Sequence, residues 1–189
     1  RPFLRSKNCV GTGILNEYSA KDLKAFQGNI LLFPDFADLS APATTYPLLQ
    51  ELKEKAQGRK VVSLLGSINF RKGIKLLLES IPLLPEEDYF FLIAGKSSLT
   101  VQQENDLRTF EKIPDESCFN ALIAESDLIF AAYKQFTGSS NLLTKAAAFR
   151  KPVIVSHGFC MGQRVEQYGT GQTTGEDNAG ECSAAIRSL

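Results

Sequence analysis

Residues 60–66 read KVVSLLG and residues 88–96 read DYFFLIAGK, and these two stretches decide the fold. Each contains a short continuous run of apolar residues and reaches a Gly at or near its end. Such runs are typical of strands that are buried on both faces, whereas a strand with one wet face alternates between apolar and polar residues. The two stretches therefore predict parallel strands with helices covering both sides of a sheet.

Helical patterns lie between the expected strands. Residues 72–84 read KGIKLLLESIPLL, in which Ile74, Leu77, Leu78 and Ile81 share one helical face and Pro82 closes the pattern. Further strands are expected at residues 127–133, 151–156 and 170–174, with a short one at 108–113, and further helices at 99–107, 117–126, 139–149 and from 178 onward. This alternation predicts an α/β fold, a doubly wound parallel sheet of the Rossmann-like kind, with strand order 3-2-1-4-5-6.

The first 58 residues have a different pattern. We expect a strand at 10–17, a short helix at 19–27 and a strand at 29–34, which are too few elements to bury a sheet on both faces. Residues 34–47 are rich in Pro, Ala, Ser and Thr, and a short charged helix is expected at 50–59. The predicted organisation is residues 1–38 as a partial unit, 39–58 as a linker with a short helix, and 59–189 as the main domain.

Composition excludes several classes of protein. The formal net charge is zero, which argues against bulk nucleic-acid binding because that requires a basic excess. Four separate cysteines and one histidine predict neither a zinc site nor a disulfide framework, and favour reduced thiols in a cytoplasmic protein. No apolar run approaches the ~20 residues that span a bilayer. The start has neither an initiator Met nor an apolar signal core, so we expect a fragment or a processed chain.

Ligands of open parallel sheets bind at the carboxyl ends of the strands, so the loops after the strands are the candidate site. The loop 66–73, GSINFRKG, offers Gly66 for close backbone approach and the basic pair Arg71 and Lys72 just before a helix start. The alternative is a solvated basic turn. The loop 134–141, KQFTGSSN, places Gly138, Ser139 and Ser140 before an Ala-rich helix, where they can cap the helix and also hold a phosphate.

The sequence offers no recognisable catalytic group in these loops. They contain no carboxylate pair at helical spacing, no Ser-His-Asp arrangement and no pair of acids for a metal ion. The only histidine, His157, follows a strand and is expected to have a structural role, with a catalytic base as the alternative. The region is therefore predicted to bind a ligand; its catalytic residues stay unknown.

Three stretches together resemble a family. They are VVSLLGSINFRKGIKLLLESIPLLP with YFFLIAGK, then SDLIFAAYKQFTGSSNLLTKAAAFRKPVIVS, then VEQYGTGQTT. They are similar to the C-terminal domain of the group 1 (GT4-like) glycosyltransferases of the GT-B fold, over residues 59–189. Residues 13–38 resemble the end of the N-terminal domain and the crossover between the two domains.

The resemblance implies a function and a set of partners. It implies that residues 59–189 bind a nucleotide-diphosphate sugar as a substrate, with no cofactor and no essential metal. It implies transfer of the sugar to a glycan or lipid-linked acceptor, as in polysaccharide biosynthesis, and an N-terminal domain that the chain lacks. The protein would be cytoplasmic, with a peripheral position at the inner face of the membrane left open, and the isolated chain would be inactive.

The match to the family motifs is mixed. Gly66, Lys72 and Gly73 match the family's G-R-x-x-x-x-K-G loop, but Ser67 stands where the family has Arg. Thr137 and Lys145 stand where the family has two glutamates, the first of which contacts the donor sugar while the second grips the ribose hydroxyls. Gly138 matches the first Gly of that motif, and Ser140 replaces the second.

Three functions remain open at this point. The first is a divergent transferase whose donor is held by Gly66, Ser67, Lys72, Gly138, Ser139, Ser140 and Lys145. The second is a non-catalytic relative that binds a nucleotide or a protein. An unrelated domain such as a signalling receiver is less favoured, because it needs an acidic cluster at the strand ends.

Overall fold

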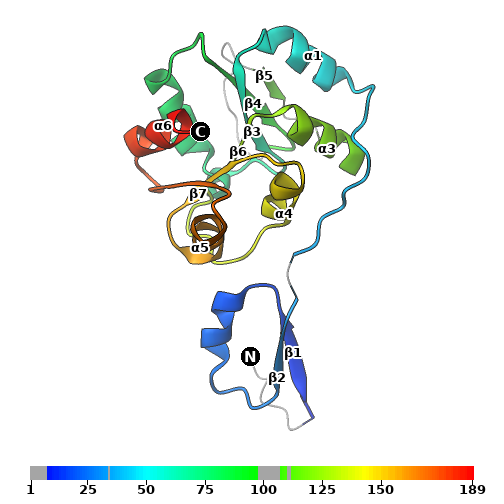
Figure 1. Ribbon diagram of the computed structural model, residues 1–189, viewed down its shortest axis with the longest axis vertical. Helices are drawn as coiled ribbons and strands as arrows, with labels where there is room; N and C mark the ends of the chain where they lie inside the picture. Colours follow the sequence, from blue (N-terminus) through cyan, green and yellow to red (C-terminus); the bar gives the residue numbers. More distant parts are fainter. Residues whose placement is uncertain (1–7, 34, 98–106, 110–111) are drawn as a thin grey trace.

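Strand β3 (Lys60–Leu65) lies at the centre of a six-stranded sheet in the computed structural model, which describes residues 8–33, 35–97, 107–109 and 112–189 (Figure 1). The strand order is β5-β4-β3-β6-β7-β8, and every pair is parallel. This order confirms the predicted arrangement 3-2-1-4-5-6. The other strands are β4 (Tyr89–Ala94), β5 (Leu107–Thr109), β6 (Leu128–Ala131), β7 (Val153–Ser156) and β8 (Gly171–Thr174).

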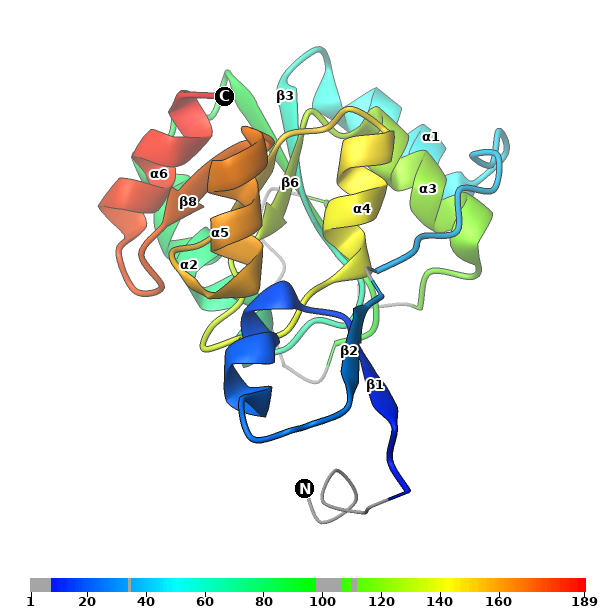
Figure 2. The ribbon, with the colours of Figure 1, turned by 60° about the horizontal axis from the view of Figure 1, so that its bottom comes forward.

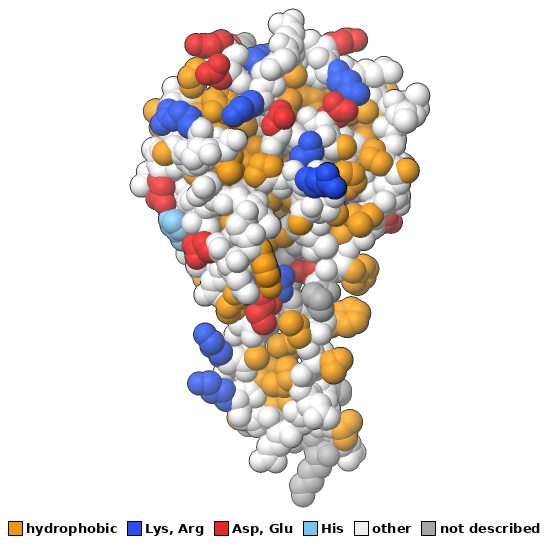
Figure 3. Space-filling model, viewed as in Figure 1, with side chains coloured by type: hydrophobic (Ala, Val, Ile, Leu, Met, Phe, Trp, Pro, Cys, Tyr) orange, Lys and Arg blue, Asp and Glu red, His pale blue; other side chains and the backbone are white. Residues whose placement is uncertain are grey.

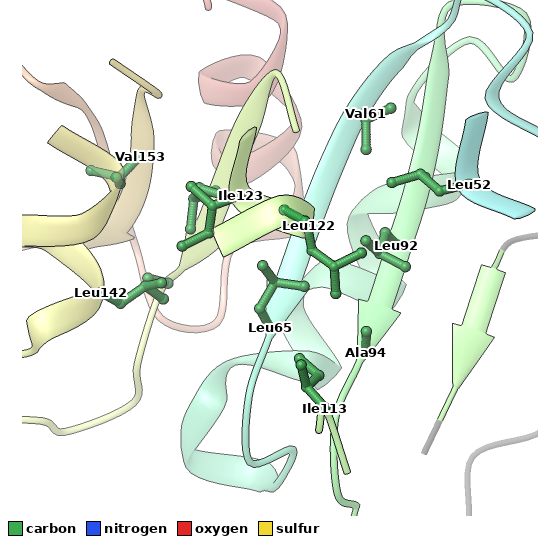
Figure 4. Close-up of a cluster of buried hydrophobic side chains, with 14 of the residues drawn as sticks. Leu52, Val61, Leu65, Leu92, Ala94, Ile113, Leu122, Ile123, Leu142 and Val153 are labelled. Carbon is green, nitrogen blue, oxygen red and sulfur yellow. The ribbon is translucent and has the colours of Figure 1, made fainter. Parts of the chain in front are cut away.

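The central strands are buried on both faces, as their composition predicts. In β3, Val61 and Leu65 pack into one apolar cluster, whereas Val62 and Leu64 pack into a second cluster on the opposite face. The same alternation continues in β4, β6 and β7. Figure 4 shows the first cluster, in which side chains of the sheet and of the covering helices meet. Each cluster needs its own layer of helices, and this requirement produces a three-layer domain.

The helices divide between the two faces (Figure 2). Side chains of α1, α3, α4 and α5 belong to the first cluster, and those of α2 and α6 belong to the second. The bounds are α1 (Pro47–Ala56), α2 (Ile74–Ser80), α3 (Glu116–Glu125), α4 (Asn141–Ala148), α5 (Phe159–Tyr168) and α6 (Ala179–Arg187). Within the described part of the chain, no helix is both long enough and apolar enough to cross a membrane.

Several predicted elements differ from the structure in detail. The helix predicted at 72–84 is shorter, because η3 (Phe70–Lys72) and η4 (Ile81–Leu83) at its ends are 3-10 turns and Pro82 lies inside the second. Helix α5 was not predicted at all, since a Gly interrupts its apolar pattern. The helix expected at 99–107 falls almost wholly outside the described residues. The strand expected at 108–113 is β5, which begins one residue earlier and ends at Thr109.

The four cysteines are free thiols, and Cys118, Cys160 and Cys182 are buried. Burial raises the pKa of the Cys160 thiol to about 11, because a buried thiolate would lose its hydration. A thiol with so high a pKa is a poor nucleophile at neutral pH. Cys160 therefore contributes to packing.

The N-terminal segment forms a small separate unit below the main domain in Figure 1. It consists of β1 (Gly11–Ile14), the 3-10 helix η2 (Glu17–Leu23) and β2 (Asn29–Leu32), and the two strands pair in parallel. The short helix predicted at 19–27 is this 3-10 helix. Every residue of β2 is exposed, so the unit buries little of its own apolar surface.

Arg164 of α5 joins this N-terminal unit to the main domain. Its guanidinium donates to the Glu17 carboxylate at 3.0 and 2.5 Å and to the Leu15 carbonyl at 3.0 Å. The Asn16 side-chain amide also donates to the Thr137 carbonyl at 2.8 Å. These contacts fix the unit against the carboxyl-end loops of the sheet.

We predict that Gly95→Ala disrupts the junction between β3 and β4. Gly95 has φ +138°, and a Cβ there would lie 1.9 Å from the Gly66 carbonyl oxygen. The free energy of unfolding, measured by urea titration, should fall by at least about 3 kcal/mol, or the chain should not fold. The matched control is Gly58→Ala, where φ is +83° but the space is open, with an expected cost of about 1–2 kcal/mol. Equal costs for the two substitutions would contradict this account.

We also predict that the attachment of the N-terminal unit weakens in acid. The hydrogen bonds from Arg164 lower the pKa of Glu17, so this carboxylate stabilises the folded state above its ordinary pKa and loses that effect as the pH falls through the lowered value. The stability difference between wild type and Glu17→Gln should therefore shrink from pH 6 to about pH 3. Thermal unfolding at several pH values measures this difference. A difference that stays constant would refute the prediction, and Glu51→Gln in the exposed pair with Lys55 is the control.

Candidate functional site

Two loops meet at the carboxyl ends of β3 and β6. The first runs from Gly66 through η3, and the second runs from Ala132 to Ser140, where α4 begins. The amide of Lys134 donates to the Arg71 carbonyl at 2.8 Å, which ties the loops together. Gly73 makes the close approach possible, because a Cβ there would lie 2.2 Å from the Ala132 carbonyl oxygen. The Gly that follows Lys72 therefore has a steric role.

One cavity between these loops has a volume of about 210 Å³, and we refer to it as the Lys72 cavity. Four of the predicted site residues line it, namely Gly66, Lys72, Ser140 and Lys145. The rest of the wall comes from the end of β3, from α3, from the residues after β6 and from the start of α4: Leu65, Glu116, Phe119, Tyr133, Asn141 and Leu142. The structure thus brings together residues that are up to 79 positions apart in the sequence, from Gly66 to Lys145.

The Lys72 ammonium lies beside Tyr133. It donates to the Tyr133 hydroxyl at 2.6 Å and lies 3.9 Å from the centre of the ring. Tyr133 is buried, and its ring packs edge-on against Phe136 with centroids 5.4 Å apart. A neutral partner leaves the positive charge of Lys72 uncompensated, so the ammonium can still attract an anion.

Ser140 precedes α4 and caps it, as predicted. Its hydroxyl accepts from the Leu142 amide at 3.4 Å. The first amides of an α-helix lack intrahelical partners and lie at the positive end of the helix dipole. Ser140 and the first two residues of α4, Asn141 and Leu142, line the same cavity as Lys72.

Lys145 differs from the open phosphate ligand that the sequence predicts. Its ammonium is buried, contacts the Glu116 carboxylate and donates to the Asn120 side-chain oxygen at 2.8 Å. The Phe119 ring lies 5.1 Å from the same ammonium. The charge of Lys145 is therefore neutralised by α3, although the residue does line the cavity.

A second cavity, of about 550 Å³, lies beside the first, and we refer to it as the Phe136 cavity. Its lining residues are Phe70, Arg71, Lys134, Gln135, Phe136, Thr137 and Gly138. Gly138 is the one predicted site residue in this wall. Ser67 and Ser139 line neither cavity.

The loop at the Phe136 cavity is held by acidic residues that follow β8. Gln135 has φ +48°, an unfavourable conformation for this residue type, and its amide donates to Glu176 at 2.7 Å. Lys134 donates to both oxygens of Asp177, at 2.6 and 2.9 Å, and these bonds lower the pKa of Asp177 and raise that of Lys134. The loop is therefore fixed in shape by contacts from outside the cavity.

Sequence reasoning missed Glu116, Phe119 and Tyr133. Glu116 and Phe119 lie on α3, outside the loops that follow the expected strands, and Tyr133 is the last residue of its expected strand. No local motif marks a carboxylate in the first turn of α3. His157 lies away from both cavities and contacts Glu181. In the part of the chain that the structure describes, no group of three His, Cys, Asp or Glu residues could hold a metal ion.

Comparison with known proteins gives one family and one fold. Among curated proteins, no sequence match was found. WaaG, a glycosyltransferase involved in lipopolysaccharide biosynthesis, superimposes with a TM-score of 0.70 at 16% identity, covering 93% of this chain and 52% of WaaG. HepE from Anabaena, solved in complex with UDP-glucose, gives a TM-score of 0.73 at 14% identity, covering 95% and 53% of the two chains.

A third structure is similar to most of the main domain. It is the C-terminal domain of a glycosyl transferase group 1 family protein, LpcC, from Francisella tularensis, with a TM-score of 0.60 and 14% identity over 79% of this chain and 84% of that one. The chain thus spans about half the length of WaaG and HepE and shares their GT-B fold. The family described as glycosyl transferases group 1 matches residues 59–189. The chain belongs to the group 1 glycosyltransferases.

Proposed function

We propose that this chain is the donor-binding half of a glycosyltransferase, which transfers a sugar from a nucleotide-diphosphate donor to a glycan or lipid-linked acceptor. The observation that carries the proposal is the convergence of Lys72, Gly66 and the start of α4 on one cavity. A cation and free helix amides are what a diphosphate requires. HepE, which has the same fold, was solved with UDP and glucose and with UDP-glucose.

The diphosphate would lie between the Lys72 ammonium and the backbone of Gly138 to Ser140. The Tyr133 hydroxyl holds Lys72 at the wall of the cavity without neutralising it. The sugar would extend from the diphosphate toward the neighbouring Phe136 cavity, whose wall includes Thr137 and Gly138. The same two loops therefore serve both parts of the donor.

An N-terminal domain would complete the enzyme. Among its described residues the N-terminal unit has two strands, and it exposes a group of large apolar side chains that Figure 3 shows on its surface. These residues are Val10, Leu15, Ile30, Leu31, Leu32, Phe33, Phe36 and Leu39. Exposed apolar groups of this size mark surfaces that another protein segment covers. We infer that the acceptor-binding domain packs there.

The alternative function is a non-catalytic module that binds a nucleotide or a protein. Thr137 and Lys145 favour it, since neither can replace the carboxylates that the family places at these positions. Transfer by the completed protein would exclude this alternative, whereas nucleotide binding without transfer would support it.

We predict that Lys72→Ala weakens nucleotide binding. Removing one hydrogen bond to a charged group should cost about 1–3 kcal/mol of affinity for UDP, measured by isothermal titration calorimetry. Lys75→Ala is the matched control, because Lys75 lies one turn away on the same segment and pairs with Glu79 at 3.6 Å. An unchanged dissociation constant for Lys72→Ala would move the diphosphate to another site.

We also predict that the 189-residue chain has no transferase activity alone. Among the described residues the N-terminal unit has two strands, and every residue of β2 is exposed, so it lacks the layers of a complete acceptor-binding domain. Incubation with UDP-glucose and a panel of glycan acceptors should give no transfer above a protein-free blank. Robust transfer by this chain would overturn the proposed division of the enzyme into two halves.

A further inference from the structure

Three charged side chains line the Lys72 cavity: Lys72, Glu116 and Lys145, the last of which is almost wholly buried and pairs with Glu116. Lys72 and Glu116 have opposite signs and different surroundings. The Lys72 ammonium, next to η3, has the Tyr133 hydroxyl as its neutral partner. The Glu116 carboxylate comes from the first turn of α3 and is 54% exposed. A diphosphate drawn to Lys72 would be repelled by Glu116. A ligand that fills this cavity must therefore be anionic at one end and carry hydrogen-bond donors at the other.

Lys145 holds Glu116 in this position. The side chain of Lys145 is only 3% exposed, and its ammonium contacts the Glu116 carboxylate and the Asn120 oxygen. Withdrawing one partner would leave a buried cation incompletely compensated, which is costly. Lys145 therefore stays paired with Glu116 and Asn120 of α3, and it fixes the Glu116 carboxylate at the cavity wall.

Asn120 helps to hold Lys145 in this position. It is fully buried, and its side-chain amide donates to the carbonyls of Asp38 at 3.2 Å and Ser40 at 2.9 Å. These two bonds use its donors, so the side-chain oxygen is left to accept from Lys145. The Lys145 ammonium is thereby oriented from two sides.

Glu116 keeps capacity for a ligand. An ionised carboxylate accepts about four hydrogen bonds and donates none. Lys145 satisfies part of this capacity, and the exposed remainder faces the cavity. Its partner in a ligand must be a donor, and the hydroxyls of a sugar ring next to a phosphate are donors of this kind.

We propose that Glu116 accepts hydrogen bonds from the ribose hydroxyls of the nucleotide, and that Lys145 is its positioning residue. The inference rests on the proposed binding of a nucleotide diphosphate in the Lys72 cavity. It assigns selection of ribonucleotides over deoxyribonucleotides to α3, through a carboxylate that enters the cavity from a helix distant in sequence from both phosphate loops.

The test compares the dissociation constants of UDP and 2′,3′-dideoxy-UDP by calorimetry. Wild type should bind UDP about 10- to 100-fold more tightly, the range for hydrogen bonds to a charged group. Glu116→Gln should reduce this preference at least about fivefold, since a neutral amide is a weaker acceptor. Lys145→Met should also reduce it, although it leaves Glu116 in place. That ratio of two affinities would not change if Lys145 served stability alone.

A double variant distinguishes the loss of the ribose contact from a loss of folding. Glu116→Gln leaves Lys145 buried without its anion, whereas Glu116→Gln with Lys145→Met removes both charges and should fold with the preference equally reduced. The matched control is Glu125→Gln, a carboxylate on the same helix that pairs with Lys53 at 3.0 Å outside the cavity, and it should keep the wild-type preference.

The outcomes separate this inference from the proposed function. If UDP binds and the double variant keeps the full preference, the ribose is held elsewhere and the role of Glu116 is refuted, while nucleotide binding stands. If wild type binds both ligands equally, Glu116 does not contact the hydroxyls, and the inference again fails alone. If wild type binds neither ligand, the proposed nucleotide site fails and the role of Glu116 fails with it.

Discussion

Burial of β3 and β4 on both faces is the constraint from which the rest of the structure follows. Because Val61 and Val62 point to opposite sides, each side needs its own layer of helices, which α1, α3, α4 and α5 supply on one face and α2 and α6 on the other. Because every strand pair is parallel, the carboxyl ends of the strands lie at one edge of the sheet. The two faces of the central strands are covered by helices, whereas the loops at that edge line the Lys72 cavity.

The candidate site combines rigid backbone with an unusual distribution of charge. Close backbone contacts at Gly73 and Gly95 leave the first loop little freedom, and the acids after β8 fix the second. Within this frame, one lysine faces the cavity with a neutral partner while Lys145 is buried against Glu116. Two lysines near one cavity therefore differ in function because their surroundings differ.

The strands and the sheet order could be predicted because continuous apolar runs and right-handed crossovers leave few alternatives. The two loops that line the Lys72 cavity could be located for the same reason, since they directly follow β3 and β6. The remainder depends on contacts between distant segments. Glu116 and Lys145 are 29 positions apart in the sequence, and no pattern in either segment predicts that they pair. Helix α5 escaped prediction because Gly162 packs under the turn after β7, so a small residue stands where an apolar one was expected.

Asn120 also connects regions that the sequence keeps far apart. Its amide binds the crossover at Asp38 and Ser40, and its oxygen binds Lys145 beneath the cavity. A continuous series of polar contacts therefore runs from Glu116 through Lys145 and Asn120 to the crossover. Its consequence is that the crossover is anchored to polar residues of the cavity wall, so the same side chains that shape the cavity also hold the segment leading to the N-terminal unit.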